Sequence, residues 1–145
     1  MIWTLSNRAD PRALPLADRH YNRQKPGSPQ FVPPGRCVVL LTPDAGALWV
    51  SSWPFAEYVR HRWPGAWVCS CFRRESGPRA SELIRDAIAA TRAIWGDPPE
   101  LGMVTFVDRS HVKPIIVHGV KTWGRTYMLA GFELDGETKG GLLAF

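Results

Sequence analysis

The chain of 145 residues is 45% apolar and 21% charged, a balance typical of one folded domain, which argues against a disordered chain. Thirteen Gly and thirteen Pro favour many turns over a helical bundle, and the net charge of +5 suits an anionic partner such as nucleic acid or a phosphorylated cofactor. We expect a single cytoplasmic domain over residues 1–145 with no membrane contact, because no membrane-length apolar run, secretory signal or disulfide spacing is apparent.

Short strands and turns dominate the first half of the chain. The predicted elements, in chain order, are a strand at 2–5, a short helix within 12–23, a loop over 25–35, strands at 36–42 and 47–53, a helical turn from 54 and a strand at 66–72. The turn residues PDAG between the second and third strands indicate a hairpin. We expect Cys69 and Cys71 to share one face of the last strand as small buried side chains.

The clearest helix is predicted at residues 80–95, because its apolar residues recur at spacings of three and four. Ser81 and Glu82 suit its start and Gly96 suits its end. The elements expected after it are a strand at 102–107, a short helix at about 123–130, and strands at 132–137 and 141–145. Residues 109–124 match no motif. This alternation predicts a mixed α/β or α+β sheet covered by helices.

A strand, a loop containing Arg and Gly, and the long helix follow one another at residues 72–84 (FRRESGPRASELI). Such a junction points free backbone N–H groups and the positive end of the helix dipole at one place, which suits a pyrophosphate. The candidate anion-binding residues are Arg73, Arg74, Ser76, Gly77, Arg79 and Ala80. The alternative is a solvated loop with Arg side chains on its surface.

Tyr127 lies four residues before Gly131, which is followed directly by Phe132. On a short helix that ends at Gly131, its phenol would lie one turn before the end. Such a group can protonate a leaving thiolate, because its pKa of about 10 is close to that of a thiol. The alternative is a Tyr side chain that only packs against the core.

The order of these elements over about residues 36–145 resembles the GNAT superfamily of N-acetyltransferases. In that family a loop of the form Q/R-x-x-G-x-G/A binds the pyrophosphate of acetyl-coenzyme A. Residues 74–77 (RESG) match its first half, and the small residue Ala80 comes one position late. The resemblance implies a mostly antiparallel, twisted sheet flanked by helices, a splayed pair of parallel strands, an acyl-CoA cofactor, and Tyr127 as general acid toward the coenzyme thiolate.

The polar and aromatic cluster at residues 20–23 (HYNR) and the closing pattern A-G-F-x-x-x-G-E-T-x-G-G-L resemble phage acyltransferases related to Mom, within the same superfamily. Those proteins modify the exocyclic amine of adenine in DNA. His20 can take a proton near neutral pH, Tyr21 can stack on a base and Arg23 can hold a phosphate. The alternative is that these residues end a helix and pack under a loop.

Further candidates follow predicted strands. Ser52 and Trp53 are candidate substrate-binding residues, and Glu57 and Asp108 are candidate bases. Trp53 would otherwise belong to the core, and Asp108 would otherwise mark an ordinary strand end. The His and Cys spacings indicate no metal site.

Together these residues and the two resemblances imply an acyl-CoA-dependent N-acyltransferase, with an exocyclic nucleobase amine in DNA as one acceptor. The alternatives are an acetyltransferase for a small amine or a protein, and a non-catalytic basic domain that binds nucleic acid or protein.

Overall fold

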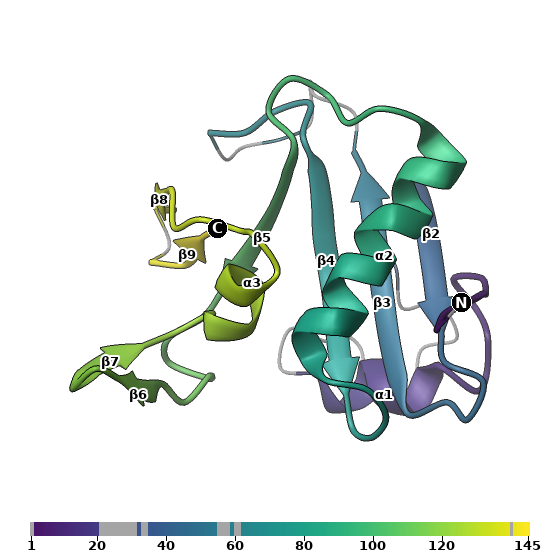
Figure 1. Cartoon of the computed structure of the whole chain (residues 1–145). Helices are drawn as coiled ribbons and strands as arrows, with labels where there is room; N and C mark the ends of the chain where they lie inside the picture. The colour runs from purple at the N-terminus through teal and green to yellow at the C-terminus, as the bar shows by residue number, and fades with distance from the viewer. Residues whose placement is uncertain (1, 21–31, 33–34, 55–58, 60–61, 140) are drawn as a thin grey trace.

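A seven-stranded sheet forms the centre of the protein in a computed structural model that describes residues 2–20, 32, 35–54, 59, 62–139 and 141–145 (Figure 1). The strand order is β1-β2-β3-β4-β5-β9-β8. The strand bounds are Thr4–Leu5 (β1), Arg36–Leu41 (β2), Ala47–Trp53 (β3), Trp67–Arg74 (β4), Met103–Val107 (β5), Gly136–Glu137 (β8) and Leu143–Ala144 (β9). All neighbours pair antiparallel except β4 and β5, which are parallel. The predicted mixed α+β class is confirmed.

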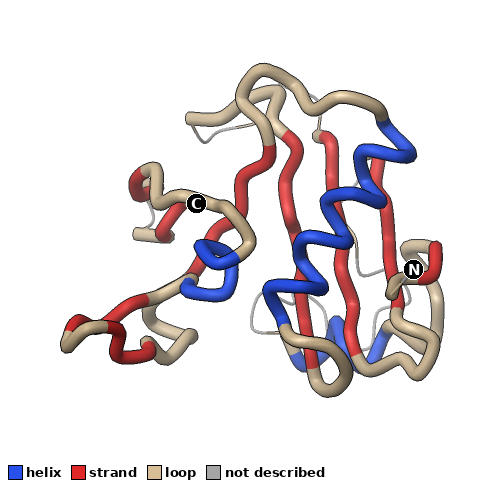
Figure 2. The backbone as a smooth tube through the Cα atoms, viewed as in Figure 1, coloured by secondary structure: helices blue, strands red, loops and turns tan. Residues whose placement is uncertain are grey.

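Helices cover both faces of the sheet (Figure 2). Helix α2 (Ala80–Trp95) packs on one face, and α1 (Leu14–Arg19) packs on the other. Helix α3 (Arg125–Leu129) lies beside α2, where Arg85 donates a hydrogen bond to the carbonyl of Leu129 at 3.2 Å. Within the described residues, no helix combines the length and the apolar composition needed to cross a bilayer.

Because side chains alternate along each strand, the sheet packs against a hydrophobic core on each of its faces. On β2, Val38 and Leu40 pack toward α2, whereas Val39 and Leu41 pack toward α1. Such a strand must be apolar on both faces, which explains the continuous run that the sequence shows here. The helix predicted at 80–95 is confirmed with the same first and last residues. Its apolar residues form one stripe that packs against the sheet.

A β-bulge interrupts this alternation in β4. Val50 pairs with Cys71 and Ser51 pairs with Cys69, which leaves Ser70 as an extra residue. Cys69 therefore belongs to the core under α2 and Cys71 to the core under α1. The expectation that both cysteines share one face is wrong, because the bulge reverses the direction of every side chain after it.

The parallel pairing of β4 and β5 is short. It joins Trp67–Cys69 to Met103–Thr105, and beyond these residues the two strands separate toward their carboxyl ends (Figure 1). Beyond the pair Cys69–Thr105, β4 continues to Arg74 and β5 to Val107. The sheet is therefore open between the second halves of these strands, at the end where β4 enters the loop before α2.

Other elements differ from the sequence prediction in extent. The last two strands are only two residues each, and β4 runs on to include Arg73 and Arg74. Residues 109–124, for which no element was predicted, contain a hairpin of β6 (Ile115–Val117) and β7 (Val120–Thr122). The predicted loop at 25–35 and helical turn from 54 lie largely outside the described residues.

Candidate active site at the open end of β4 and β5

The loop between β4 and α2 is held against the turn that joins β2 to β3. The backbone N–H groups of Glu75 and Ser76 both donate to the carbonyl of Gly46, at 2.7 and 3.1 Å. A Cβ at Gly46 would overlap the hydroxyl of Ser76 and lie 3.2 Å from its carbonyl oxygen, so a larger residue there would displace the Ser76 side chain. The side chain of Ser76 is thus directed toward the β2–β3 turn, and this packing fixes the position of the loop.

The start of α2 offers unused backbone donors. Gly77 has a φ of +104°, and a Cβ there would meet no atom within 4 Å, so the backbone next to it is open. Arg79 caps the helix without a side-chain hydrogen bond, and the amide of Leu83 is the first to bond back, to the carbonyl of Arg79 at 3.0 Å. The N–H groups of residues 80–82 precede that bond and are the orphan donors of the helix. Orphan donors of this kind can bind an anion, and the binding of an anion at this helix start stays a prediction.

The three arginines of the loop have different roles. Arg74 turns back and donates to the carbonyls of Pro78 and Gly77, at 2.7 and 2.9 Å. Arg73 donates to Glu75 and to the carbonyl of Arg19, both at 3.0 Å. The side chain of Arg79 is exposed and makes no hydrogen bond or ion pair with the described residues. Arg73 and Arg74 therefore brace the loop, and Arg79 is the guanidinium best placed to meet an anion.

Glu75 joins this loop to the end of α1. Arg19 binds its carboxylate with two nitrogens, each at 2.6 Å, and Arg73 adds a third contact. The hydrogen bond from Arg19, with that from Arg73, lowers the pKa of Glu75 below its usual value. Glu75 stays ionised and cancels one positive charge, which leaves Arg74 and Arg79 beside the start of α2.

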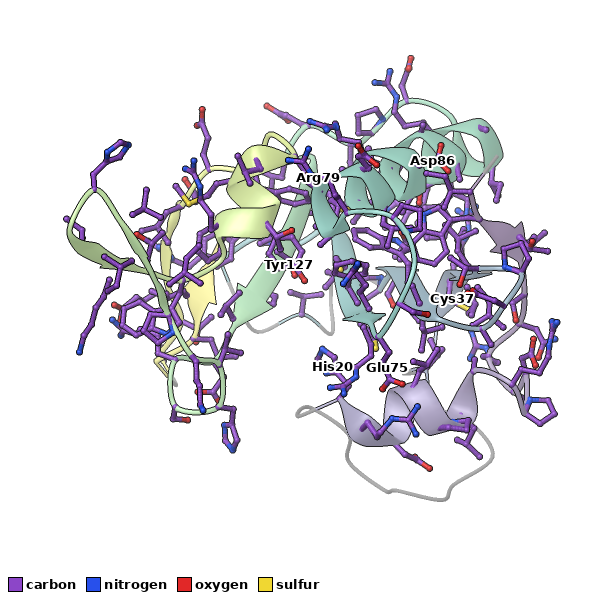
Figure 3. All side chains as sticks on the ribbon, turned by 60° about the horizontal axis from the view of Figure 1, so that its bottom comes forward. His20, Cys37, Glu75, Arg79, Asp86 and Tyr127 are labelled. Atoms are coloured by element: carbon purple, nitrogen blue, oxygen red, sulfur yellow. The ribbon has the colours of Figure 1, made fainter. Side chains whose placement is uncertain are left out.

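Tyr127 reaches the point where β4 and β5 separate. Its ring packs edge-on against Phe72 on β4 and Phe132, with centroids 6.3 and 5.6 Å away. Its side chain also packs against the core cluster that contains Cys69 and is close enough to influence that thiol, and Cys69 forms the last parallel pair with Thr105. Figure 3 shows Tyr127 on the side of α3 that faces β4. The phenol therefore lies at the base of the opening between the two strands.

The thiol of Cys69 is not a second acid or nucleophile at this position. Burial raises the pKa of Cys69 to about 12, although hydrogen bonds from Thr105 and Tyr127 act in the opposite direction. The sequence gives no signal for this contact, because the bulge at Ser70 decides which residue faces Tyr127. Without it, the residues facing α2 would be Cys69 and Cys71 rather than Cys69 and Phe72.

His20 follows helix α1, and Asp108 follows the carboxyl end of β5. His20 ends α1, whose residue Arg19 is bound to Glu75, and in Figure 3 it lies beside Glu75 rather than beside Tyr127. It approaches the sheet from the face opposite to α2. Asp108 follows β5 and accepts hydrogen bonds from Ser110 and from His111, at 2.6 and 2.9 Å. The bonds from Ser110, then that from His111, lower the pKa of Asp108, which makes it a weak base that caps a turn.

The predicted substrate-binding residues are engaged in packing or lie outside the described residues. Ser52 is buried and shares a hydrogen bond of 2.9 Å with Ser70 at the bulge. Trp53 stacks among Trp67 and Trp95 and donates to the carbonyl of Gly65 at 3.2 Å. Both fit structural roles. Tyr21, Arg23 and Glu57 lie outside the described residues.

An open groove lies toward the other end of β5. Its volume is about 530 Å³, and it is lined by Ile88, Met103 and Phe132 together with the carboxylates of Glu100, Glu133 and Asp135. Among the described residues no Lys or Arg lines it, and its carboxylates make it unsuited to a pyrophosphate. Phe132 separates this groove from Tyr127.

The described residues contain no group of three or more His, Cys, Asp or Glu side chains that could hold a metal ion. The chain matches no protein-family model, no curated protein and no solved structure.

Proposed function

We propose that the protein is an acyl-CoA-dependent N-acyltransferase with a GNAT-like fold. The observation that carries this proposal is the place of Tyr127. Its phenol meets the last parallel pair of β4 and β5, and the donors at the start of α2 lie at the same open end of β4. A thioester held between the strands would then have an acid at its sulfur and an anion site for the attached diphosphate.

The residues at the start of α2 fit such a diphosphate. The N–H groups of residues 80–82 and the guanidinium of Arg79 would bind its oxygens, and the open backbone at Gly77 would admit it. Arg74 would act indirectly, because it holds the carbonyls of Gly77 and Pro78 away from the anion. The bound cofactor would supply an acyl carbonyl that an amine can attack.

In the proposed reaction a C–N bond forms and the C–S bond breaks. Tyr127 donates its phenolic proton to the departing sulfur, and the acceptor amine loses one proton to a base. His20 is the candidate for that role in the part of the chain that the structure describes; it ends α1, which packs on the face of the sheet opposite to α2. Glu57 is a further candidate from the sequence, whereas the hydrogen bonds to Asp108 make it a weak base.

The acceptor class that we propose is an exocyclic nucleobase amine in DNA, in agreement with the net charge of +5. A nucleobase amine is already neutral but poorly nucleophilic, so positioning must supply much of the rate. A base in a duplex must also leave the stack to reach the phenol. A small amine or a protein amine is the other acceptor class. Mass spectrometry of nucleosides after expression separates them, since unmodified DNA excludes the nucleobase.

The cofactor site is tested by melting temperature with millimolar acetyl-CoA. At 100 times the dissociation constant, a ligand adds about 2.7 kcal/mol, which raises the melting temperature by roughly 5–10 °C in a domain of this size. We expect this shift in the wild type and its loss in Gly77→Ala, because a methyl group at a positive φ strains the backbone that admits the diphosphate.

Gly96→Ala is the matched control. Gly96 ends the same helix with a φ of +84°, and a Cβ there also meets no atom within 4 Å, so both substitutions carry similar strain. The control should melt at a similar temperature without ligand and keep the shift. A wild type that does not respond to acetyl-CoA would contradict the proposal and favour a non-catalytic binding domain.

A further inference from the structure

The hairpin of β6 and β7 extends away from the body of the protein (Figure 1). Its register pairs Ile115 with Thr122, Ile116 with Lys121 and Val117 with Val120. His118 and Gly119 join the strands, and their φ angles of +50° and +78° are those of a two-residue type I′ turn. Such a turn matches the twist of paired strands, so this arm has a defined shape before it meets any partner.

Both faces of this arm are exposed. Ile115 and Val120 are 51% and 63% exposed on one face, and Ile116 is 65% exposed on the other. An isolated two-stranded hairpin is marginally stable in water, and branched apolar side chains left open on both faces are unusual unless a partner covers them. A protein surface would cover one face, whereas a groove with two walls covers both.

Charge indicates the partner. Residues 109–125 contain four cationic side chains, Arg109, Lys113, Lys121 and Arg125, and no Asp or Glu. Arg109 is bridged to Glu137 at 2.9 Å, and Lys113 and Lys121 are exposed on the arm and its base. Lys121 lies directly opposite Ile116, so one face presents an ammonium group beside an apolar side chain. A run of this kind is complementary to a polyanion with apolar surfaces between its charges.

We propose that the β6–β7 hairpin inserts into the major groove of a nucleic-acid duplex. That groove is about 12 Å wide in B-form DNA and admits a two-stranded ribbon. Lys113 and Lys121 contact phosphates, while Ile115 and Ile116 contact base edges and thymine methyl groups. This inference rests on the proposed function, because DNA bound by the hairpin would serve as its substrate. Strand β7 ends at Thr122, shortly before α3, which carries Tyr127. A duplex held by the arm lies next to the phenol.

The test is fluorescence anisotropy of a labelled 20-base-pair DNA duplex titrated with full-length protein at several salt concentrations. The double variant Lys113→Glu/Lys121→Glu should bind at least about tenfold more weakly at low salt. Its slope of log affinity against log salt should be smaller by about 1.8, since each lost phosphate contact removes about 0.9. Ile116→Gln should weaken binding and leave the slope unchanged, because it removes no charge.

The control is Arg92→Glu/Lys139→Glu, two exposed cations on α2 and near β8. Both double variants lower the formal net charge from +5 to +1, so a nonspecific charge effect would weaken them equally. Equal weakening, or failure of the wild type to bind duplex DNA, would overturn the proposal. Binding of an apolar protein partner that Ile116→Gln abolishes, without any DNA binding, would assign the arm to protein recognition instead.

The melting shift with acetyl-CoA, measured on the same hairpin variants, separates this inference from the proposed function. A shift that persists in Lys113→Glu/Lys121→Glu shows a folded protein with an intact cofactor site, so a change in DNA binding belongs to the arm. Suppose that the hairpin variants lose DNA binding but acetyl-CoA shifts the melting temperature of neither the wild type nor any variant. That result would support the inference about the hairpin and contradict the proposed acyltransferase.

Discussion

At the scale of single residues, Tyr127 combines two roles that the sequence presents as alternatives. Its ring packs on Phe72 and Phe132, as a core tyrosine would, and its hydroxyl is close enough to influence the thiol of Cys69 at the end of the parallel pairing. These roles are compatible, because the ring and the hydroxyl point to different neighbours. The packing holds the phenol at one place, which is what an acid needs.

Tyr127→Phe separates the two roles. The ring contacts remain, so the melting temperature and its shift with acetyl-CoA should change little. The turnover number should fall by about 10²-fold or more, because positioned acids contribute about 10²–10⁴. Steady-state kinetics with acetyl-CoA measure this, and an unchanged turnover number would exclude Tyr127 as the acid.

The arginines show where reasoning from the sequence stops at this scale. Three Arg residues in the loop at 73–79 predict positive charge, and the charge is there. Which arginine braces the loop and which stays exposed depends on contacts with residues distant in the chain and on the backbone conformation of the loop. Arg73 binds the carbonyl of Arg19, and Arg74 binds carbonyls that the turn at Gly77 presents. No local pattern encodes the fold that brings α1 beside this loop.

At the scale of elements, a chain of buried polar groups ties β3 to α2. The indole N–H of Trp49 donates to the hydroxyl of Ser51 at 2.7 Å. The hydroxyls of Ser51 and Thr91 lie 2.8 Å apart, and that of Thr91 donates to the carbonyl of Ala87 at 2.8 Å. Since Thr91 uses its proton on Ala87, Ser51 must donate to Thr91. Every group in this chain is satisfied in one direction, which fixes the position of the helix along the strand.

Thr91→Val should therefore destabilise the protein more than its small change of shape suggests. The buried hydroxyl of Ser51 loses its acceptor, which costs about 1–3 kcal/mol. Thr122→Val is the control, because the Thr122 hydroxyl donates to the nearby carbonyl of Val120 at 3.2 Å in an exposed position on the hairpin. Urea denaturation measures both free energies of unfolding. Equal effects of the two variants would show that the buried chain has no special importance.

Elements with a long run of periodic apolar residues were predicted better than elements with a short one. Helix α2 has four turns of apolar periodicity, and its ends were correct. The hairpin of β6 and β7 has three residues in each strand and buries neither face, so alternation gave no signal. The dipeptide His118-Gly119 between two branched apolar residues is the one local feature that indicates it. The bulge at Ser70 has no such signature, because it depends on how β4 meets β3.

At the scale of the whole molecule, two acidic residues hold the N-terminal part of the chain to the sheet. Glu75 binds Arg19 at the end of α1, and Asp10 holds the turn before α1 through Arg12 and Ser6. Helix α1 has only six residues, too few for independent stability, so these contacts and its apolar face must keep it in place. The candidate base His20 follows directly, which links the acid stability of this region to the proposed site.

This arrangement predicts that the protein loses stability in acid because of Asp10. The hydrogen bonds from Arg12, with that from Ser6, hold the pKa of Asp10 well below its usual value. A carboxylate with a lowered pKa in the folded protein contributes its stability above the ordinary value, about 3.9, and loses it as the pH falls through the folded one. Asp10→Asn should cost about 1–3 kcal/mol at pH 6, since the bonds to charged groups are lost.

The difference between the wild type and Asp10→Asn should shrink as the pH falls below about 4, because Asp10 then takes up a proton in the unfolded chain while it stays ionised in the folded protein, which favours unfolding. Asp97→Asn is the control, since the Asp97 side chain is 96% exposed and meets only Arg92, at 3.3 Å. Its difference from the wild type should stay small at every pH. Melting temperatures between pH 6 and 2.5 measure both, and a constant difference for Asp10→Asn would show that its contacts do not depend on the charge.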